Sequence, residues 1–157
     1  KESVYRQYDH EVGINTVIRP GADAALLRIK GTSQAIAIST DGNGRYCYLD
    51  PYRGGALAVA EAARNVVCVG ARPIALTNCL NLGNPERPDI YYQLKDVIRG
   101  MARACRALKV PVISCNVSLY NETQGQAIYP TPVVGTVYRL PPLRLASPGD
   151  GNGYTLL

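Results

Sequence analysis

The chain has 157 residues, of which 46% are hydrophobic, so it is long and apolar enough to fold as one domain around a core. Its net charge of +5 favours an anionic ligand, but the 17 basic residues are scattered and form no run of the kind that is typical of a nucleic-acid-binding tract. The five cysteines form no CxxC pair and no apolar stretch is long enough to span a membrane, which argues against a disulfide framework, a zinc site or a membrane protein and favours a cytoplasmic location.

The first predicted element is a helix over residues 1–11, because Val4, Tyr8 and Val12 share one face at spacings of four residues. Gly13 ends this helix. The next predicted elements are two short strands within 15–31, broken at Pro20 and Gly21, and a third strand over 34–40. The sequence DGNGR after the third strand predicts a turn.

The hydrophobic pattern of the following segment predicts two helices. Residues 55–70 form a helix of small residues that Gly70 closes, and small side chains let a helix lie close to a sheet. Residues 84–109 form a longer helix. Its predicted buried stripe consists of Ile90, Leu94, Val97, Met101, Cys105 and Leu108. The remaining predicted strands are 73–81, 110–117 and 131–140.

The order of these elements predicts the fold class. Strands and helices are interspersed, which favours a single α/β sandwich with the helices over one face of a mixed β-sheet. Residues 1–140 are assigned to this domain, and residues 141–157, which are rich in Pro and Gly, to a linker or tail.

Polar residues stand where predicted strands end and on one face of the small-residue helix. In open α/β sheets ligands gather beyond the strand ends, and carboxylate and amide oxygens are the ligands that Mg²⁺ prefers. Because Mg²⁺ usually comes with phosphates, the set favours a magnesium–nucleotide site. Its members are Asp23, Asp41, Glu61, Asn65, Asn78, Asn116 and Ser118.

Several of these residues also have a plainer structural interpretation. Asp41 begins the sequence DGNG, where an Asp commonly makes a turn, and Glu61 can pair with Arg64 on a solvated helix face. Asn78 can satisfy a neighbouring backbone group within its strand. His10 is the only histidine, which argues against Cys–His catalysis, and the sequence contains no glycine-rich phosphate loop.

Longer motifs resemble those of one enzyme family. The stretches STDGNGRYCYLDPYRGG, TNCLNLGNPERP, SCNVSLYNET and AIYPTPVVGTV are similar to those of phosphoribosylformylglycinamidine synthase, the synthetase subunit of purine biosynthesis. The resemblance runs from about Val4 to Leu140. It fits the second of the two N-terminal-type domains of this family, because the ESHNHPS-like stretch that holds the catalytic histidine of the first domain has no counterpart here.

The resemblance implies a fold like the N-terminal domain of aminoimidazole ribonucleotide synthetase, in which the sheets of two such domains pair into a barrel. It implies a domain of an ATP-dependent C–N ligase that converts formylglycinamide ribonucleotide to formylglycinamidine ribonucleotide with ammonia from glutamine. The implied cofactors are ATP and Mg²⁺. The implied partners are the remaining synthetase domains, a glutamine amidotransferase subunit and a small accessory subunit, with no nucleic acid and no membrane.

The resemblance also implies roles for individual residues. The expected metal ligands are Asn116, Glu61 and Asn65, of which the last two match residues that hold a structural nucleotide with Mg²⁺ in larger relatives. The expected nucleotide contacts are Asn78, Cys115 and Asp41, and the expected substrate contact is Ser118. Two positions depart from the family pattern, because Asn78 replaces an Asp and Cys115 replaces a Gly that lets a phosphate approach the backbone closely.

Two functions of different classes remain open. The domain either completes the ligase active site or is a catalytically silent pairing module that keeps a structural nucleotide pocket. Asn116 and Ser118 favour the first function, and the changes at Asn78 and Cys115 favour the second. In either case we expect the isolated fragment to lack ligase activity and to form a homodimer through the sheet face that a sister domain would otherwise cover.

Overall fold

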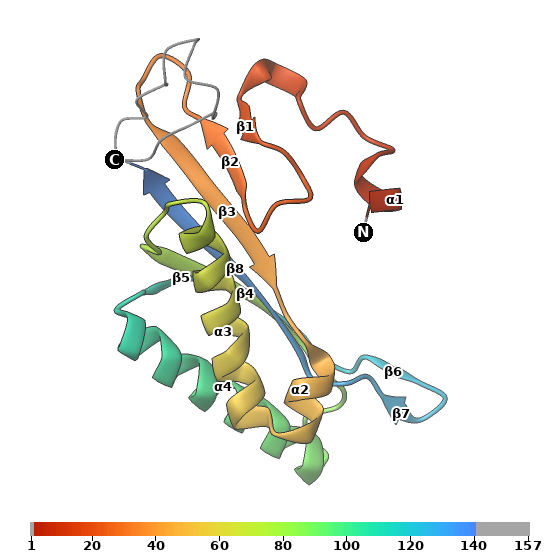
Figure 1. The fold of residues 1–157 in the computed structure, drawn as a ribbon. Helices are drawn as coiled ribbons and strands as arrows, with labels where there is room; N and C mark the ends of the chain where they lie inside the picture. Colours follow the sequence, from red (N-terminus) through yellow and green to blue (C-terminus); the bar gives the residue numbers. More distant parts are fainter. Residues whose placement is uncertain (1, 141–157) are drawn as a thin grey trace.

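The computed structural model describes residues 2–140, so the predicted tail of residues 141–157 lies outside the described part of the chain. The described residues form two layers, in which two long helices lie against one face of a twisted sheet (Figure 1). The other face of that sheet carries no helix from the described residues. Within residues 2–140, no helix combines the length and the hydrophobicity that a membrane crossing requires.

Helical elements and strands are interspersed along the described chain. The helical elements are α1 (Glu2–Tyr5), the 3₁₀ turn η1 (Val12–Ile14), α2 (Gly44–Leu49), α3 (Pro51–Cys68) and α4 (Pro88–Leu108). The strands are β1 (Thr16–Ile18), β2 (Ala25–Arg28), β3 (Ala35–Asp41), β4 (Ala75–Asn81), β5 (Val112–Ser118), β6 (Glu122–Thr123), β7 (Gln126–Ala127) and β8 (Thr131–Leu140).

The large sheet has six strands in the order β1-β2-β3-β8-β4-β5, and β6 and β7 form a separate two-stranded hairpin. Strands β4 and β5 are parallel, and all other neighbours in the large sheet are antiparallel. This mixed sheet with helices on one face confirms the predicted fold class. The sheet is open at β1 and at β5, so the described residues close no barrel by themselves.

The main core lies between the sheet and the helices. Successive side chains of a strand point to opposite faces, so every second residue of β4 meets the helix layer. Leu76 and Leu80 of β4 are buried there against Val59 of α3 and against Val97 and Met101 of α4. A polar residue an even number of positions from these leucines therefore points toward the helices, and one an odd number away points to the other face.

Local signals explain where the helices begin and end. Asp50 caps α3 by accepting a backbone hydrogen bond, and Pro51 fits its first turn, so the helix begins earlier than the predicted residue 55. Gly70, with φ of 80°, ends it as predicted. The turn predicted at DGNGR leads directly into α2, because the Asn43 side chain accepts backbone hydrogen bonds and caps a helix that begins at Gly44.

The predicted helix over residues 1–11 is wrong beyond its first turn. The helix α1 ends at Tyr5, and Val4 and Tyr8 of the predicted apolar face are 63% and 70% exposed. Most helical stability comes from packing an apolar face, and this face does not pack into the core. The stripe of α4 is buried as predicted at most of its positions, but Leu108 at its end is 44% exposed.

The crossing of α3 and α4 depends on Gly100, because a Cβ at this position would overlap the carbonyl oxygen of Tyr52. We expect Gly100→Ala to lower the free energy of unfolding by about 1–3 kcal/mol in urea denaturation, despite the higher helix propensity of Ala. Ala107→Ser, at an exposed position of the same helix, is the control and should cost less than about 1 kcal/mol. Equal stability of the two variants would contradict the close crossing.

Candidate functional site

A cavity of about 560 Å³ brings together part of the predicted polar set. Asp41 reaches it from the end of β3, and Asp23 from the segment that precedes β2. Glu61 and Asn65 reach it from α3, where they are one helical turn apart. We call this space the α3 cavity; its polar walls are the three carboxylates of Asp23, Asp41 and Glu61, with the amide of Asn65 and the hydroxyls of Tyr5 and Ser39.

One carboxylate oxygen in the α3 cavity is unsatisfied. Oδ1 of Asp41 accepts a hydrogen bond from Nδ2 of Asn65 at 2.9 Å, whereas its Oδ2 is buried and has no partner among the described residues. Such an oxygen is costly to bury, and a cation would satisfy it. The cavity fits Mg²⁺ that arrives with a nucleotide, since such an ion needs only one or two protein carboxylates. Within residues 2–140 no cluster of three His, Cys, Asp or Glu side chains could hold an ion alone.

The plainer interpretations of Asp41 and Glu61 find no support in the structure. Asp41 is the last residue of β3 rather than part of a turn, and its carboxylate is bound to α3. Glu61 makes no ion pair with Arg64 among the ion pairs of the described residues. Both carboxylates therefore remain available to a ligand in the α3 cavity.

Asn116 and Ser118 lie on the other face of the sheet, which no helix of the described part of the chain covers. In the β4–β5 ladder Asn116 pairs with Cys79 and Ser118 pairs with Asn81, and paired residues point to the same face. We call it the open face, and its side chains include Ile36, Ile38, Thr40, Thr77, Cys79, Asn81, Ser114, Asn116, Ser118, Val133 and Val137. Nδ2 of Asn116 donates to Cys79 Sγ at 3.3 Å, and its Oδ1 makes no hydrogen bond within the described residues.

Asn78 and Cys115 point to the opposite side from Asn116 and Ser118. Asn78 and Cys115 pair with each other in the β4–β5 ladder. Asn78 lies two residues from the buried Leu76 and two from the buried Leu80, so it points to the same face as these leucines. Oδ1 of Asn78 is buried without a partner in the described chain, so it does not satisfy a backbone group as the plainer interpretation expected. Strand alternation therefore divides the predicted polar set between two faces of the sheet, and its role as a magnesium–nucleotide site stays a prediction.

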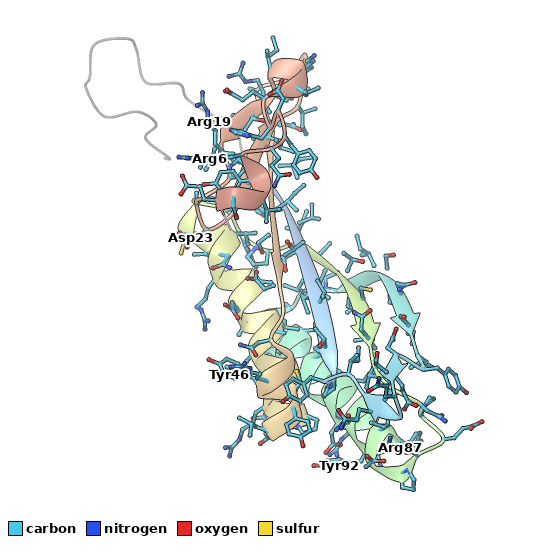
Figure 2. All side chains as sticks on the ribbon, turned by 90° about the vertical axis from the view of Figure 1, so that its right-hand side faces the viewer. Arg6, Arg19, Asp23, Tyr46, Arg87 and Tyr92 are labelled. Carbon is cyan, nitrogen blue, oxygen red and sulfur yellow. The ribbon has the colours of Figure 1, made fainter. Side chains whose placement is uncertain are left out.

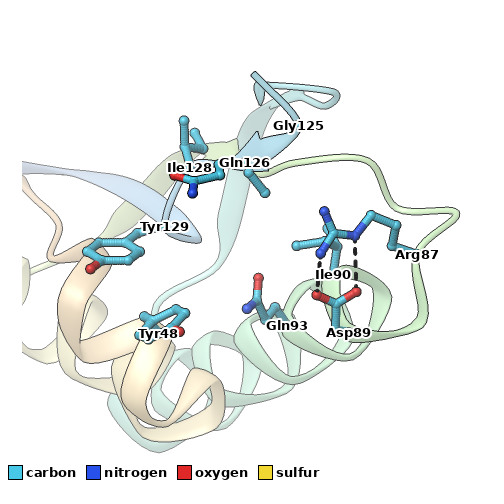
Figure 3. Close-up of a pocket in the computed structure, with 10 residues that line it drawn as sticks. Tyr48, Arg87, Asp89, Ile90, Gln93, Gly125, Gln126, Ile128 and Tyr129 are labelled. Atoms are coloured by element: carbon cyan, nitrogen blue, oxygen red, sulfur yellow. Dashed lines mark hydrogen bonds and ion pairs between the residues drawn. The ribbon is translucent and has the colours of Figure 1, made fainter. Parts of the chain in front are cut away.

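The loops beyond β4 and β5 contain contacts that no sequence pattern marked. Arg87 pairs with Asp89 at 2.9 Å and with Glu122 at 3.8 Å, and its hydrogen bond lowers the pKa of the Asp89 carboxyl. Arg87 and Asp89 border a second cavity, of about 330 Å³, into which Gln93 of α4 points (Figure 3). This cavity is separate from the α3 cavity, since Arg87 and Asp23 lie far apart along the molecule (Figure 2). Only the density of polar residues in NPERP and YNE could have indicated these contacts.

Most of the chain is similar to known proteins. Residues 21–137 match the family model described as AIR synthase related protein, N-terminal domain. The chain is 64% identical over 141 residues to the phosphoribosylformylglycinamidine synthase subunit PurL of Moorella thermoacetica, a match that covers 90% of this chain and 19% of that protein. The chain therefore spans about a fifth of the length of this curated relative.

Solved structures of Thermotoga maritima proteins share the architecture. The structure of PurLQS matches with a TM-score of 0.84 at 40% identity, over 90% of this chain and 24% of that chain. PurL complexed with FGAR matches with a TM-score of 0.79 at 40% identity, over 90% of this chain and 23% of that chain. PurL complexed with ATP matches with a TM-score of 0.79 at 38% identity, over 90% and 23% of the two chains.

The cysteines should differ sharply in reactivity. Cys68 and Cys115 are exposed, whereas burial raises the pKa of the Cys47 thiol to about 11 and also raises that of Cys105. Because the thiolate is the reactive form, we expect Ellman's reagent to modify the exposed pair in the folded protein and the buried pair only in denaturant. Cys115→Ser should remove one fast-reacting thiol. An unchanged number of fast thiols in that variant would contradict the exposed position of Cys115 on the edge strand.

Proposed function

This chain belongs to the AIR synthase related protein family by its N-terminal-type domain, and we propose that it is the second such domain of a phosphoribosylformylglycinamidine synthase. In this role it contributes nucleotide, Mg²⁺ and substrate contacts to the ATP-dependent conversion of formylglycinamide ribonucleotide to formylglycinamidine ribonucleotide, with ammonia derived from glutamine. In this proposal the ligase activity belongs to the whole protein, which is cytoplasmic. The chain corresponds to about a fifth of that protein, by comparison with its relative. The isolated domain is inactive in this view.

The pair Asn116 and Ser118 at the carboxyl end of β5 carries the proposal. Both side chains reach the open face at a strand end, which is where ligands of open α/β sheets gather. The structurally similar PurL of T. maritima was solved with FGAR and with ATP, which supports both ligand classes for the protein that contains this domain. No feature of the fold alone would distinguish this reaction from others.

Each residue of the pair has a definite chemical task. The Ser118 hydroxyl donates a hydrogen bond to an anionic oxygen of the ribonucleotide. Asn116 offers Oδ1 to Mg²⁺, because its Nδ2 is already directed at Cys79. When bound with ATP, Mg²⁺ neutralises phosphate charge during phosphoryl transfer to the substrate amide oxygen. Since an amide carries no charge, Asn116 helps to orient the ion and leaves charge compensation to other groups.

The α3 cavity is proposed to hold a second, structural nucleotide. Glu61 and Asp41 supply carboxylates, and Asn65 supports Asp41 through the 2.9 Å hydrogen bond. An Mg²⁺ ion bound there with phosphates would satisfy the buried Oδ2 of Asp41. Asn78 and Cys115 are proposed to contact the catalytic nucleotide from the helix-facing side of the β4–β5 pair.

The open face is proposed to pair with the sheet of a sister domain in the same protein. Its apolar part lies on the central strands β3 and β8 and includes Ile36, Ile38, Val133 and Val137. The similarity to T. maritima PurL in the PurLQS structure supports an assembly with further subunits, which we take to be a glutamine amidotransferase and a small accessory subunit.

The partly exposed apolar part of the open face also favours a second candidate, a catalytically silent pairing module. A module of this kind needs the apolar surface but not the hydroxyl at the end of β5. The changes at Asn78 and Cys115 agree with this alternative, because they alter expected nucleotide contacts. The two candidates therefore differ in what the loss of the Ser118 hydroxyl should do.

We expect Ser118→Ala in the full-length synthase to raise KM for formylglycinamide ribonucleotide about tenfold to hundredfold, because a hydrogen bond to a charged group contributes about 1.5–3 kcal/mol. Steady-state kinetics and thermal unfolding of the same preparations provide the measurement. Ser114→Ala is the matched control, since Ser114 lies on the same strand and face and its carbonyl, not its hydroxyl, binds Thr77. An unchanged KM with a lowered Tm in Ser118→Ala would make Ser118 structural and favour the silent module.

The isolated domain should form a two-fold homodimer through the open face. Apolar surface left in water costs about 25 cal/mol per Å², and an identical copy offers the surface that the sister domain would cover. Light scattering coupled to size exclusion should give twice the monomer mass of 16.9 kDa. Val133→Glu on the open face should yield the monomer, whereas Val67→Glu, which is exposed on α3, should not. A wild-type monomer at tens of micromolar would refute the pairing.

A further inference from the structure

The Ser118 hydroxyl lies against the side chain of Asn121. Nδ2 of Asn121 is 2.9 Å from the Ser118 carbonyl oxygen, 3.0 Å from the Leu82 carbonyl oxygen and 3.1 Å from Ser118 Oγ. Oδ1 of the same amide lies 3.3 Å from Ser118 Oγ. A single amide therefore contacts the ends of β4 and β5 and both polar atoms of Ser118 that could bind a ligand.

The neighbours of the Asn121 amide determine its orientation. The carbonyl oxygens of Leu82 and Ser118 can only accept hydrogen bonds, so the amide atom that lies between them is the nitrogen. Its two protons meet three acceptors, so one proton is shared between a carbonyl oxygen and Ser118 Oγ in a bifurcated hydrogen bond. The Ser118 hydroxyl proton has only the long 3.3 Å contact to Oδ1, which is a weak hydrogen bond. An anionic oxygen of a ligand can therefore accept a hydrogen bond from the Ser118 hydroxyl, while Nδ2 of Asn121 keeps Ser118 Oγ in place.

The backbone around Asn121 holds the amide in this position. The Tyr120 amide donates to the Gly83 carbonyl at 3.1 Å, the Asn121 amide to the Leu82 carbonyl at 3.1 Å, and the Ile128 amide to the Asn121 carbonyl at 3.0 Å. Tyr120 has φ of 60°, a left-handed conformation that bulky residues adopt rarely and that persists where surrounding contacts enforce it. The loops that follow β4, β5 and β7 are therefore tied together at Asn121.

We propose that Asn121 is a positioning residue for substrate binding: its amide holds Ser118 Oγ at the end of β5 and leaves the hydroxyl proton for an anionic oxygen of the ribonucleotide, such as a phosphate oxygen. This role rests on the proposed function of Ser118 as the substrate contact. It goes beyond that function because Asn121 itself makes no contact with the ligand and acts through Ser118.

The test uses the full-length synthase and four variants: Ser118→Ala, Asn121→Ala, Asn121→Ser and the double variant Ser118→Ala/Asn121→Ala. Calorimetry gives Kd for formylglycinamide ribonucleotide, and kinetics separate KM from kcat. We expect Asn121→Ala to raise Kd and KM about tenfold, with kcat changed less than about twofold. The double variant should bind no more weakly than Ser118→Ala alone, because Asn121 acts through that hydroxyl. Asn121→Ser, which keeps a short donor, should show a smaller rise and covers the case that Asn121→Ala does not fold.

Asn43→Ala is the control for a merely structural effect. Asn43 caps α2 through its side chain, so its loss should lower Tm without changing Kd. Asn121→Ala with a lowered Tm and an unchanged Kd would overturn the proposal, as would losses in Kd that multiply in the double variant.

A crystal structure of an Asn121 variant tests the positioning role without reference to activity. Ser118 Oγ should occupy more than one rotamer in the variant and one in the wild type, and an unchanged single rotamer would overturn the proposal. If the wild-type synthase binds no formylglycinamide ribonucleotide, the proposed function fails, while this structural comparison still decides whether Asn121 positions Ser118.

Discussion

The fold depends on one constraint: within residues 2–140, helices cover only one face of the six-stranded sheet. Because side chains alternate along a strand, every second residue of a central strand faces the helices, where most side chains are apolar, and the residues in between face the open side. In β4 the buried positions are Leu76 and Leu80, and Thr77, Cys79 and Asn81 fall on the open face. The parallel register between β4 and β5 carries the same alternation into β5. The burial of Leu76 and Leu80 therefore determines which face the side chains at the end of β5 reach.

This division explains why the polar residues form two groups with different surroundings. In the α3 cavity, Asp41 is held by a helix and part of its carboxylate is cut off from water, so a buried oxygen remains for a cation. At the end of β5, Asn116 and Ser118 stand on the face that no helix of residues 2–140 covers, and they contact Cys79 and Asn121 there. A structural ligand suits the first environment, and a substrate that enters and leaves suits the second.

The parts of the fold that depend on local periodicity could be predicted from the sequence, and the parts that depend on tertiary partners could not. The stripe of α4 is visible because its spacing of three and four residues extends over many turns. Residues 1–11 show a similar spacing over a short stretch, but no core surface meets it, so the helix stops at Tyr5. The helix α2 was missed because Asn43 favours both a turn and a helix cap, and only the chain that follows decides between them.

The candidate site was predictable to a similar extent. The membership of Asp41, Glu61 and Asn65 in one cavity follows from a strand end and a spacing of four residues on a helix, both of which the sequence contains. The alternation in ALTNCLN already placed Asn78 with the buried leucines, so its separation from Asn116 was also available in principle. The contacts of Asn121 were not, because they join loops that are distant in sequence and arise from backbone conformations such as that of Tyr120.

The register of β4 and β5 also changes the meaning of the two departures from the family pattern. Asn78 and Cys115 are direct partners in the ladder, so the departures lie in one place rather than at two independent contacts. Both point to the face opposite to Asn116 and Ser118, because Asn78 is the neighbour of Cys79 in β4 and Cys115 is the neighbour of Asn116 in β5. A larger side chain at 115 and an uncharged one at 78 therefore alter a single place on the helix-facing side, where we propose that the nucleotide binds. The hydroxyl and amide of the open face keep the positions that their own neighbours, Cys79 and Asn121, give them. A change in how the nucleotide is held is thus compatible with an unchanged substrate contact, because side chains on opposite faces of adjacent strands do not share packing partners.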